Sequence, residues 1–105
     1  MRRGEVWWAE LPKPTGRRRV LLLSRDSAYS VRSSAAVALI TYTIRNIPAE
    51  VLLGEEDGMP AKCAVKLDDI LTIPMSSLSE RITVLSQDRM AAAAKAIIFA
   101  LDLTI

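Results

Sequence analysis

A chain of 105 residues, half of them hydrophobic, is long enough to bury one core and too apolar to be intrinsically disordered. The absence of histidine excludes Ser-His-Asp and Cys-His nucleophile systems, as well as RNA cleavage by paired histidines. The single cysteine, Cys63, excludes an internal disulfide. Without histidine it cannot build a zinc site either, so we expect it to be a core residue.

The net charge of +2 conceals an uneven distribution. Residues 1–52 carry nine Lys/Arg against four Asp/Glu and residues 53–105 carry five against eight, so the two halves are +5 and −3. A basic half is typical of proteins with an anionic partner such as a nucleic acid. No apolar run reaches the ~18 residues of a membrane span, and no secretory leader is recognisable. We therefore expect a soluble cytoplasmic protein with no membrane partner.

Short β-prone segments follow one another along the chain. The first, residues 5–11, ends at Pro12, and the loop over residues 12–16 combines two prolines with a glycine. A polar loop is expected over residues 25–34 and a turn over residues 54–60. The remaining strands are predicted at residues 20–24, 35–44, 50–53, 64–67, 71–73 and 81–85.

The end of the chain changes from strand to helix character. Ser86 is a good N-cap, Asp88 suits the positive end of a helix dipole, and the four alanines after Met90 favour a helix reaching Leu101. One apolar face of this helix should pack on the sheet: Met90, Ala94, Ile97, Ile98 and Leu101. Short strands closed by one helix indicate a β-rich α+β fold, a small antiparallel barrel with a C-terminal helix, forming a single domain over residues 1–105.

Three consecutive arginines, Arg17, Arg18 and Arg19, stand directly before the apolar run that starts at Val20. A charge run at a loop end is often only a solvated surface. Here Arg18 and Arg19 lie one or two residues from a buried strand, so a rigid backbone should hold them. An arginine on a rigid element presents a fixed fork of donors to a phosphate. The run therefore indicates a phosphate-binding role.

Other polar and aromatic positions also have an ordinary structural interpretation. Ordinary β-propensity accounts for an isolated threonine such as Thr41. Lys66 and Asp68 are two residues apart, where a local ion pair is the simplest explanation. Trp7 and Trp8 must point to opposite faces of the first strand. One ring should lie in the core, and the other could serve a base-stacking surface or a partner interface.

Six segments, taken together and in order, resemble the MazF/PemK family, the toxins of bacterial toxin–antitoxin pairs. They are RGEVWWAELP, RRVLLLSRD, VALITYTI, PAEVLLGEEDGMP, CAVKLDDILTIP and ERITVLS, and the resemblance extends from Arg3 to about Leu101. It implies a sequence-selective, metal-independent endoribonuclease that cuts single-stranded mRNA to 2′,3′-cyclic phosphate and 5′-hydroxyl ends, without a cofactor. It also implies an SH3-like, CcdB/PemK-like barrel, a homodimer, and a cognate antitoxin whose extended tail occupies the RNA groove.

The resemblance also assigns site residues. By register with the family's Arg-Pro-Val sequence, the catalytic arginine falls on Arg18, and the catalytic threonine matches Thr41. The family's proline is Arg19 in this chain, so Arg17 or Arg19 could share the role of Arg18. Because arginine stays protonated, Arg18 should stabilise charge, and Thr41 should position the phosphate or the 2′-hydroxyl. The expected RNA contacts are Lys13, Arg17, Arg19, Ser24, Lys66 and Asp68.

Two further departures from the family pattern bear on chemistry and base preference. The loop over residues 12–16 lacks the family's Ser-Glu-Gln stretch, so a loop glutamate proposed as a base has no counterpart. The sequence VKLDD at residues 65–69 replaces Val-Asn-Leu-Asp-Asn and adds a charge of each sign near the expected RNA path.

Two other functions remain open. One is a non-catalytic, CcdB-like toxin that blocks a topoisomerase and needs no arginine–threonine pair. The other is an SH3-like protein-binding module. Such modules usually expose several aromatic residues in a groove, whereas this chain has five in total.

Overall fold

The computed structural model describes residues 1–104. Within them one antiparallel sheet has the strand order β4-β5-β3-β2-β1-β6. The strands are β1 (Glu5–Glu10), β2 (Arg17–Leu22), β3 (Ser34–Thr41), β4 (Glu50–Leu53), β5 (Cys63–Pro74) and β6 (Leu78–Val84). Short 3₁₀ helices η1 (Asp26–Ser30), η2 (Glu55–Asp57) and η3 (Met75–Ser77) lie in the connections, and the helix α1 (Gln87–Leu101) follows β6.

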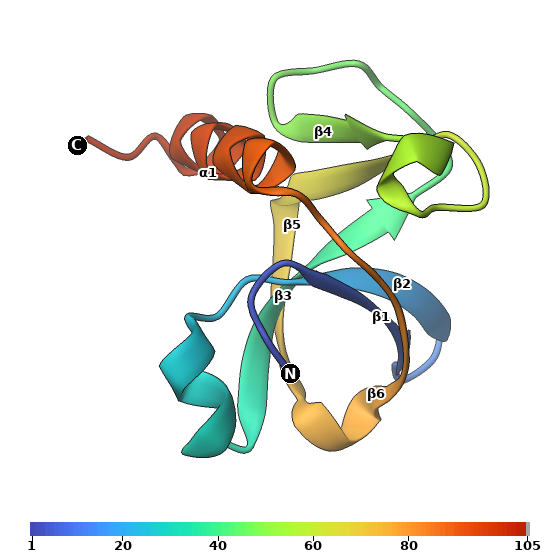
Figure 1. Ribbon diagram of the computed structural model, residues 1–105, viewed down its shortest axis with the longest axis vertical. Helices are drawn as coiled ribbons and strands as arrows, with labels where there is room; N and C mark the ends of the chain where they lie inside the picture. The colour runs from blue at the N-terminus through green and yellow to red at the C-terminus, as the bar shows by residue number, and fades with distance from the viewer. Residues whose placement is uncertain (105) are drawn as a thin grey trace.

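The sheet curls strongly, which confirms the predicted bent antiparallel barrel with a C-terminal helix (Figure 1). The helix α1 packs on β4 and β5, at one end of the sheet. No helix among residues 1–104 is long and apolar enough to cross a membrane.

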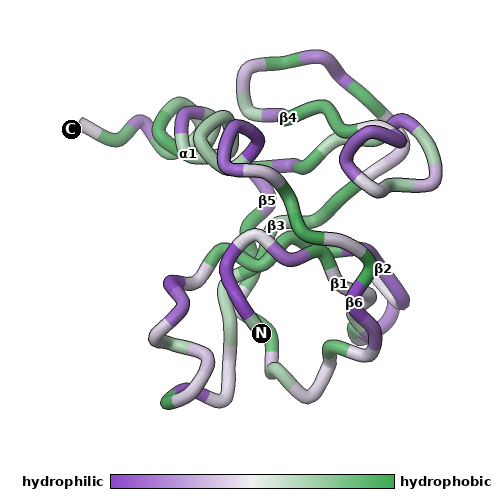
Figure 2. The backbone as a smooth tube through the Cα atoms, viewed as in Figure 1, coloured by the Kyte–Doolittle hydropathy of each residue, from purple (hydrophilic) through white to green (hydrophobic). Residues whose placement is uncertain are grey.

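Both faces of the central strands are buried. Leu21 belongs to the cluster that α1 covers, whereas its neighbours Val20 and Leu22 belong to a second cluster on the opposite face. Successive strand residues point to opposite faces, so burial on both sides explains why this run is continuously apolar rather than alternating. In Figure 2 the upper part of β3 is green, whereas the arginine-bearing end of β2 is purple.

Several predicted strand limits were wrong, including the start of β6, which is Leu78 instead of residue 81. The strand β2 begins at Arg17, not Val20, because Arg17, Arg18 and Arg19 all pair with β1. The strand β3 ends at Thr41 instead of residue 44. The two segments 64–67 and 71–73 are one strand, β5, whose pairing with β3 jumps from Lys66 to Ile70. A β-bulge of this kind absorbs extra residues and bends the strand, and no local sequence signal announced it.

The helix begins as predicted, and part of its expected apolar face is confirmed, because Met90 and Ile97 pack against the core. The Ser86 hydroxyl accepts the Arg89 backbone N–H at 3.2 Å, as an N-cap should. The buried residues are Ala93 and Ala96, whereas Leu101 is exposed. Alanine side chains are short, so this face can approach the sheet more closely than a face of larger residues.

The buried thiol of Cys63 confirms the expected core cysteine. It lies at the start of β5, and burial raises its pKa above the ordinary value. A protonated thiol is a poor nucleophile, so Cys63 fits a packing role.

Candidate active site

The three arginines of β2 divide between the two faces of the sheet. Arg19 is paired with Trp8 and Arg17 with Glu10 across the ladder to β1, so these four side chains share one face. Arg18 points to the opposite face, together with Val20. The sheet geometry therefore separates Arg18 from its two neighbours.

Arg17 and Arg19 are both engaged by other side chains. The Arg17 guanidinium lies 4.1 Å from the Trp8 ring centroid, and its Nε donates to a Glu10 carboxylate oxygen at 3.0 Å. Arg19 lies 4.4 Å from the Trp8 centroid and 4.8 Å from that of Tyr42. These are distances at which a cation is attracted to the face of an aromatic ring.

Arg18 differs from both neighbours. Among residues 1–104 its guanidinium makes no hydrogen bond, ion pair or aromatic contact, although the side chain is half-buried. Its donors are therefore available to an external ligand while its backbone is held in a ladder. A fixed guanidinium with free donors suits a phosphate oxygen.

Thr41, the last residue of β3, lies on the face of Arg18. The register pairs Val20 with Leu39, and counting two residues along each strand brings Arg18 and Thr41 to the same side. The Thr41 hydroxyl oxygen accepts the Thr43 backbone N–H at 3.0 Å. Its own O–H therefore remains available as a donor, which fits positioning of an anion better than proton abstraction.

A hollow of about 390 Å³ brings the predicted pair together. It is lined by residues from the ends of β1, β2 and β3: Trp8, Arg17, Arg18, Arg19, Ile40, Thr41, Tyr42 and Thr43. The hollow lies at the strand ends, so residues of both faces line it: Arg18 and Thr41 from one face, and Arg17 and Arg19 from the other. Within residues 1–104 no group of three or more acidic or cysteine side chains is placed to hold a metal ion.

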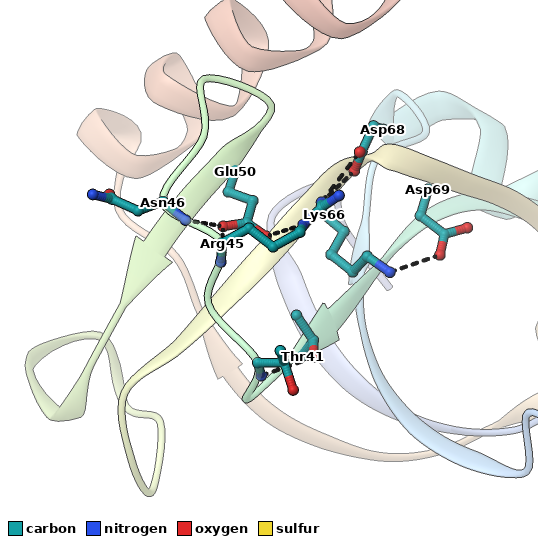
Figure 3. Close-up of polar contacts among 8 residues, drawn as sticks. Thr41, Arg45, Asn46, Glu50, Lys66, Asp68 and Asp69 are labelled. Atoms are coloured by element: carbon teal, nitrogen blue, oxygen red, sulfur yellow. Dashed lines mark hydrogen bonds and ion pairs between the residues drawn. The ribbon is translucent and has the colours of Figure 1, made fainter.

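Lys66 and Asp68 have partners that the sequence did not indicate (Figure 3). Lys66 donates to Asp69 at 3.3 Å, and Asp68 accepts two hydrogen bonds from Arg45 at 3.0 and 3.1 Å. These bonds hold the pKa of the Asp68 carboxyl below its ordinary value. In the β3–β5 ladder, Lys66 of β5 pairs with Leu39 of β3. Leu39 precedes Thr41 by two residues, so Lys66 lies near Thr41 across the ladder.

Arg45 also anchors the loop that leaves Thr41. Its Nε donates to Glu50 at 2.8 Å, and the backbone N–H groups of Arg45 and Asn46 both donate to the other Glu50 oxygen at 3.0 Å. Burial alone would raise the pKa of Glu50, but these hydrogen bonds hold it below the ordinary value. Sequence reasoning missed this cluster, since its members come from a loop and two strands.

Two other predicted RNA contacts lie outside the hollow. Ser24 follows the end of β2 opposite to the arginines, and its hydroxyl accepts the Ala36 backbone N–H at 2.9 Å. Lys13 is exposed in the β1–β2 loop, beside a second hollow that also includes Leu71 and Ile73. The structure therefore does not bring Lys13 or Ser24 together with Arg18 and Thr41 in the hollow.

The two tryptophans occupy opposite faces, as predicted. Trp7 packs against the cluster of Val20 and Leu22, and its Nε1 donates to Glu5 at 2.8 Å. Trp8 supports the two arginine side chains described above. Trp8 and Tyr42 are the two aromatic residues that line the hollow, fewer than the several exposed rings of a usual peptide-binding groove.

Residues 2–101 match the family described as the PemK-like, MazF-like toxins of type II toxin–antitoxin systems. The chain belongs to this toxin family. It is 41% identical over 101 residues to the probable endoribonuclease MazF5 of Mycobacterium tuberculosis, covering 95% of this chain and 92% of that protein. A second relative from the same species, the probable endoribonuclease MazF2, is 38% identical over 91 residues, which are 86% of this chain and 87% of that protein.

Solved toxin structures share the fold. The M. tuberculosis toxin MazF-mt6 superimposes with a TM-score of 0.89 at 31% identity, over 96% of this chain and 99% of that one. A mycobacterial endoribonuclease solved in complex with its cognate antitoxin gives a TM-score of 0.88 over 100% of this chain and 98% of that one. At 23% identity the second comparison bears on the fold alone. The predicted MazF/PemK-type toxin is confirmed.

Proposed function

We propose that this toxin is an endoribonuclease that cleaves single-stranded mRNA at selected sequences without a metal ion, using Arg18 and Thr41. The observation that carries the proposal is the Arg18 guanidinium, which has no partner among residues 1–104 and lies on the same face as the Thr41 hydroxyl. The toxin family, whose relatives are named endoribonucleases, supports it. Because mRNA is the substrate, we expect the toxin to act in the cytoplasm.

The proposed reaction is an attack by a 2′-hydroxyl on the adjacent phosphate. The 2′-hydroxyl gives up its proton to water as its oxygen forms a bond to phosphorus. The bond from phosphorus to the 5′-oxygen breaks and that oxygen takes a proton from water, which leaves a 2′,3′-cyclic phosphate and a 5′-hydroxyl. Negative charge builds on the non-bridging oxygens along this path. A guanidinium held in place before the reaction stabilises the transition state more than the ground state. One such donor typically accelerates the reaction by ~10²–10³-fold. The Thr41 O–H would donate to the same phosphate.

Cleavage of a mixed-sequence RNA in EDTA by the purified protein tests the activity, and sequencing of the products locates the cut. Arg18→Ala should lower the single-turnover rate by ~10²-fold or more. Arg32→Ala is the matched control, since it removes the same charge from an exposed position that does not line the hollow. Cleavage that disappears in EDTA, or products with 5′-phosphates, would contradict the proposed chemistry.

Thr41→Val removes the hydroxyl while keeping a β-branched side chain, so the rate should fall while the strand persists. Thr43→Val is its control, because the Thr43 backbone N–H that bonds to Thr41 remains in that variant. Equal loss of rate in both variants would argue against a chemical role for Thr41.

Lys13 and Arg17 are proposed to bind RNA without taking part in the chemistry. Each lost phosphate contact should flatten the slope of log affinity against log salt by ~0.7 for a single strand. Unchanged affinity and slope in Lys13→Ala would show that the β1–β2 loop is only a solvated edge.

A homodimer and a cognate antitoxin complete the proposal. A mycobacterial relative of the same fold was solved with its antitoxin, and the exposed side chains of Phe99 and Leu101 leave apolar surface on α1 for a second chain. Sedimentation of a monomer at micromolar concentration would refute the dimer.

A further inference from the structure

The backbone ladder between β2 and β3 stops before it reaches the candidate catalytic residues. The last pair in this direction is Val20 with Leu39. Beyond it, Arg18 and Arg19 pair only with β1, and the pairing of Thr41 is with Ala64 of β5. Arg18 and Thr41 therefore lie two residues beyond the last pair of the β2–β3 ladder, and within the described chain they are not paired with each other.

Three side chains form a stack at the strand ends, beyond this last pair. Trp8 comes from β1, Arg19 from β2, and Tyr42 follows the end of β3. The Arg19 guanidinium lies between the two rings, 4.4 Å from the Trp8 centroid and 4.8 Å from the Tyr42 centroid. In residues 1–104 the contact with Tyr42 is the one aromatic–cation contact that joins the arginine end of β2 to the end of β3.

Two members of the stack are adjacent in sequence to the candidate catalytic residues. Arg19 follows Arg18, and Tyr42 follows Thr41. Side chains alternate along a strand, so Arg19 faces away from the phosphate position and can be held without competing with Arg18. Arg17, bonded to Glu10 at 3.0 Å, places a second cation 4.1 Å from the Trp8 ring centroid.

We propose that the Trp8–Arg19–Tyr42 stack is a positioning device that joins the ends of β2 and β3 and sets Arg18 against Thr41. This inference rests on the proposed ribonuclease function. Arg19 and Tyr42 are then positioning residues, acting through their neighbours without touching the RNA phosphate. Displacement of a reacting group by about 1 Å can cost ~10²-fold in rate, so loss of the stack should lower the chemical step while the phosphate contacts persist.

Tyr42 offers variants that separate a cation–aromatic contact from simple packing. Tyr42→Phe keeps the ring and removes a hydroxyl that has no partner in the stack. Tyr42→Leu keeps an apolar side chain but removes the ring face that attracts the guanidinium. We expect Tyr42→Phe to cleave within about twofold of the parent and Tyr42→Leu to be slower by ~10-fold or more.

The readouts are the single-turnover rate at saturating toxin and the affinity for a 2′-O-methyl RNA of the mapped cut sequence, which binds but has no nucleophile. The expected result is a fall in rate for Tyr42→Leu and Arg19→Ala, with affinity changed by less than about threefold and a thermal midpoint within a few degrees of the parent. Equal rates for Tyr42→Leu and the parent would overturn the inference. So would a loss confined to affinity, which would make the stack a base-binding surface.

The parent and Arg18→Ala keep this inference distinct from the function on which it rests. A parent protein that does not cleave RNA would refute the proposed function itself. A parent that cleaves, an inactive Arg18→Ala and a fully active Tyr42→Leu would refute only the positioning role of the stack.

Discussion

Replacement of Glu50 by alanine should destabilise the protein through the loop between β3 and β4. The Glu50 side chain is fully buried, and one of its oxygens accepts the backbone N–H groups of Arg45 and Asn46 at 3.0 Å. A hydrogen bond to a charged group contributes ~1.5–3 kcal/mol, and donors in an exposed loop can regain water, so the lower end applies to each bond. The two bonds together give about 3 kcal/mol, or roughly 12–20 °C in thermal midpoint for a domain of this size.

Glu50→Gln provides a graded comparison. Its carbonyl oxygen can still accept both backbone N–H groups, but its amide would direct a donor at the Arg45 Nε, which now donates to Glu50 at 2.8 Å. We expect it to lose about 1 kcal/mol, clearly less than the alanine variant. Thermal and urea unfolding followed by circular dichroism measure both.

Asp68→Asn is the control for Glu50. It weakens the outer contact of Arg45 but leaves both loop N–H bonds in place, so its midpoint should move by only a few degrees. If Glu50→Ala were no less stable than Asp68→Asn, the buried carboxylate would not be what holds the loop.

Three further predictions concern stability and reactivity. Gly58→Ala should lower the thermal midpoint, because φ is +87° there and an added Cβ would lie 2.9 Å from the Thr83 Cβ; an unchanged melting curve would contradict this. Asp57 accepts a hydrogen bond from Arg89 at 2.9 Å, and its pKa in the folded protein is below the ordinary value. The stability that Asp57 contributes is therefore present above the ordinary carboxyl pKa and is lost as pH falls through the pKa of the folded state. The urea midpoint of Asp57→Asn should therefore fall less between pH 5 and pH 3 than that of the parent. Cys63 should react with a thiol reagent only on unfolding, and rapid reaction in the native protein would show that it is not a sealed core residue.

Local features of the sequence determined most of the elements. A run of β-branched and aliphatic residues favours a strand wherever it lies, and Ser86 caps the helix through a bond to a residue three positions away. The family resemblance assigned Arg18 and Thr41, and the register brings these two residues to one face. The strands and the helix cap depend on residues close together in sequence, whereas the family resemblance depends on a pattern spread over the whole chain.

Tertiary structure alone decided which of the three arginines has free donors. The alternation of side chains along a strand predicts that Arg17 and Arg19 share a face. Only the pairing of β2 with β1 brings Trp8 and Glu10 into contact with them. The same holds for Arg45, whose partner Asp68 is 23 residues away in sequence. The bulge in β5 and the early end of the β2–β3 ladder are likewise properties of strand pairing. Register between strands depends on how all six curl around two cores, so no short segment contains the information that sets it.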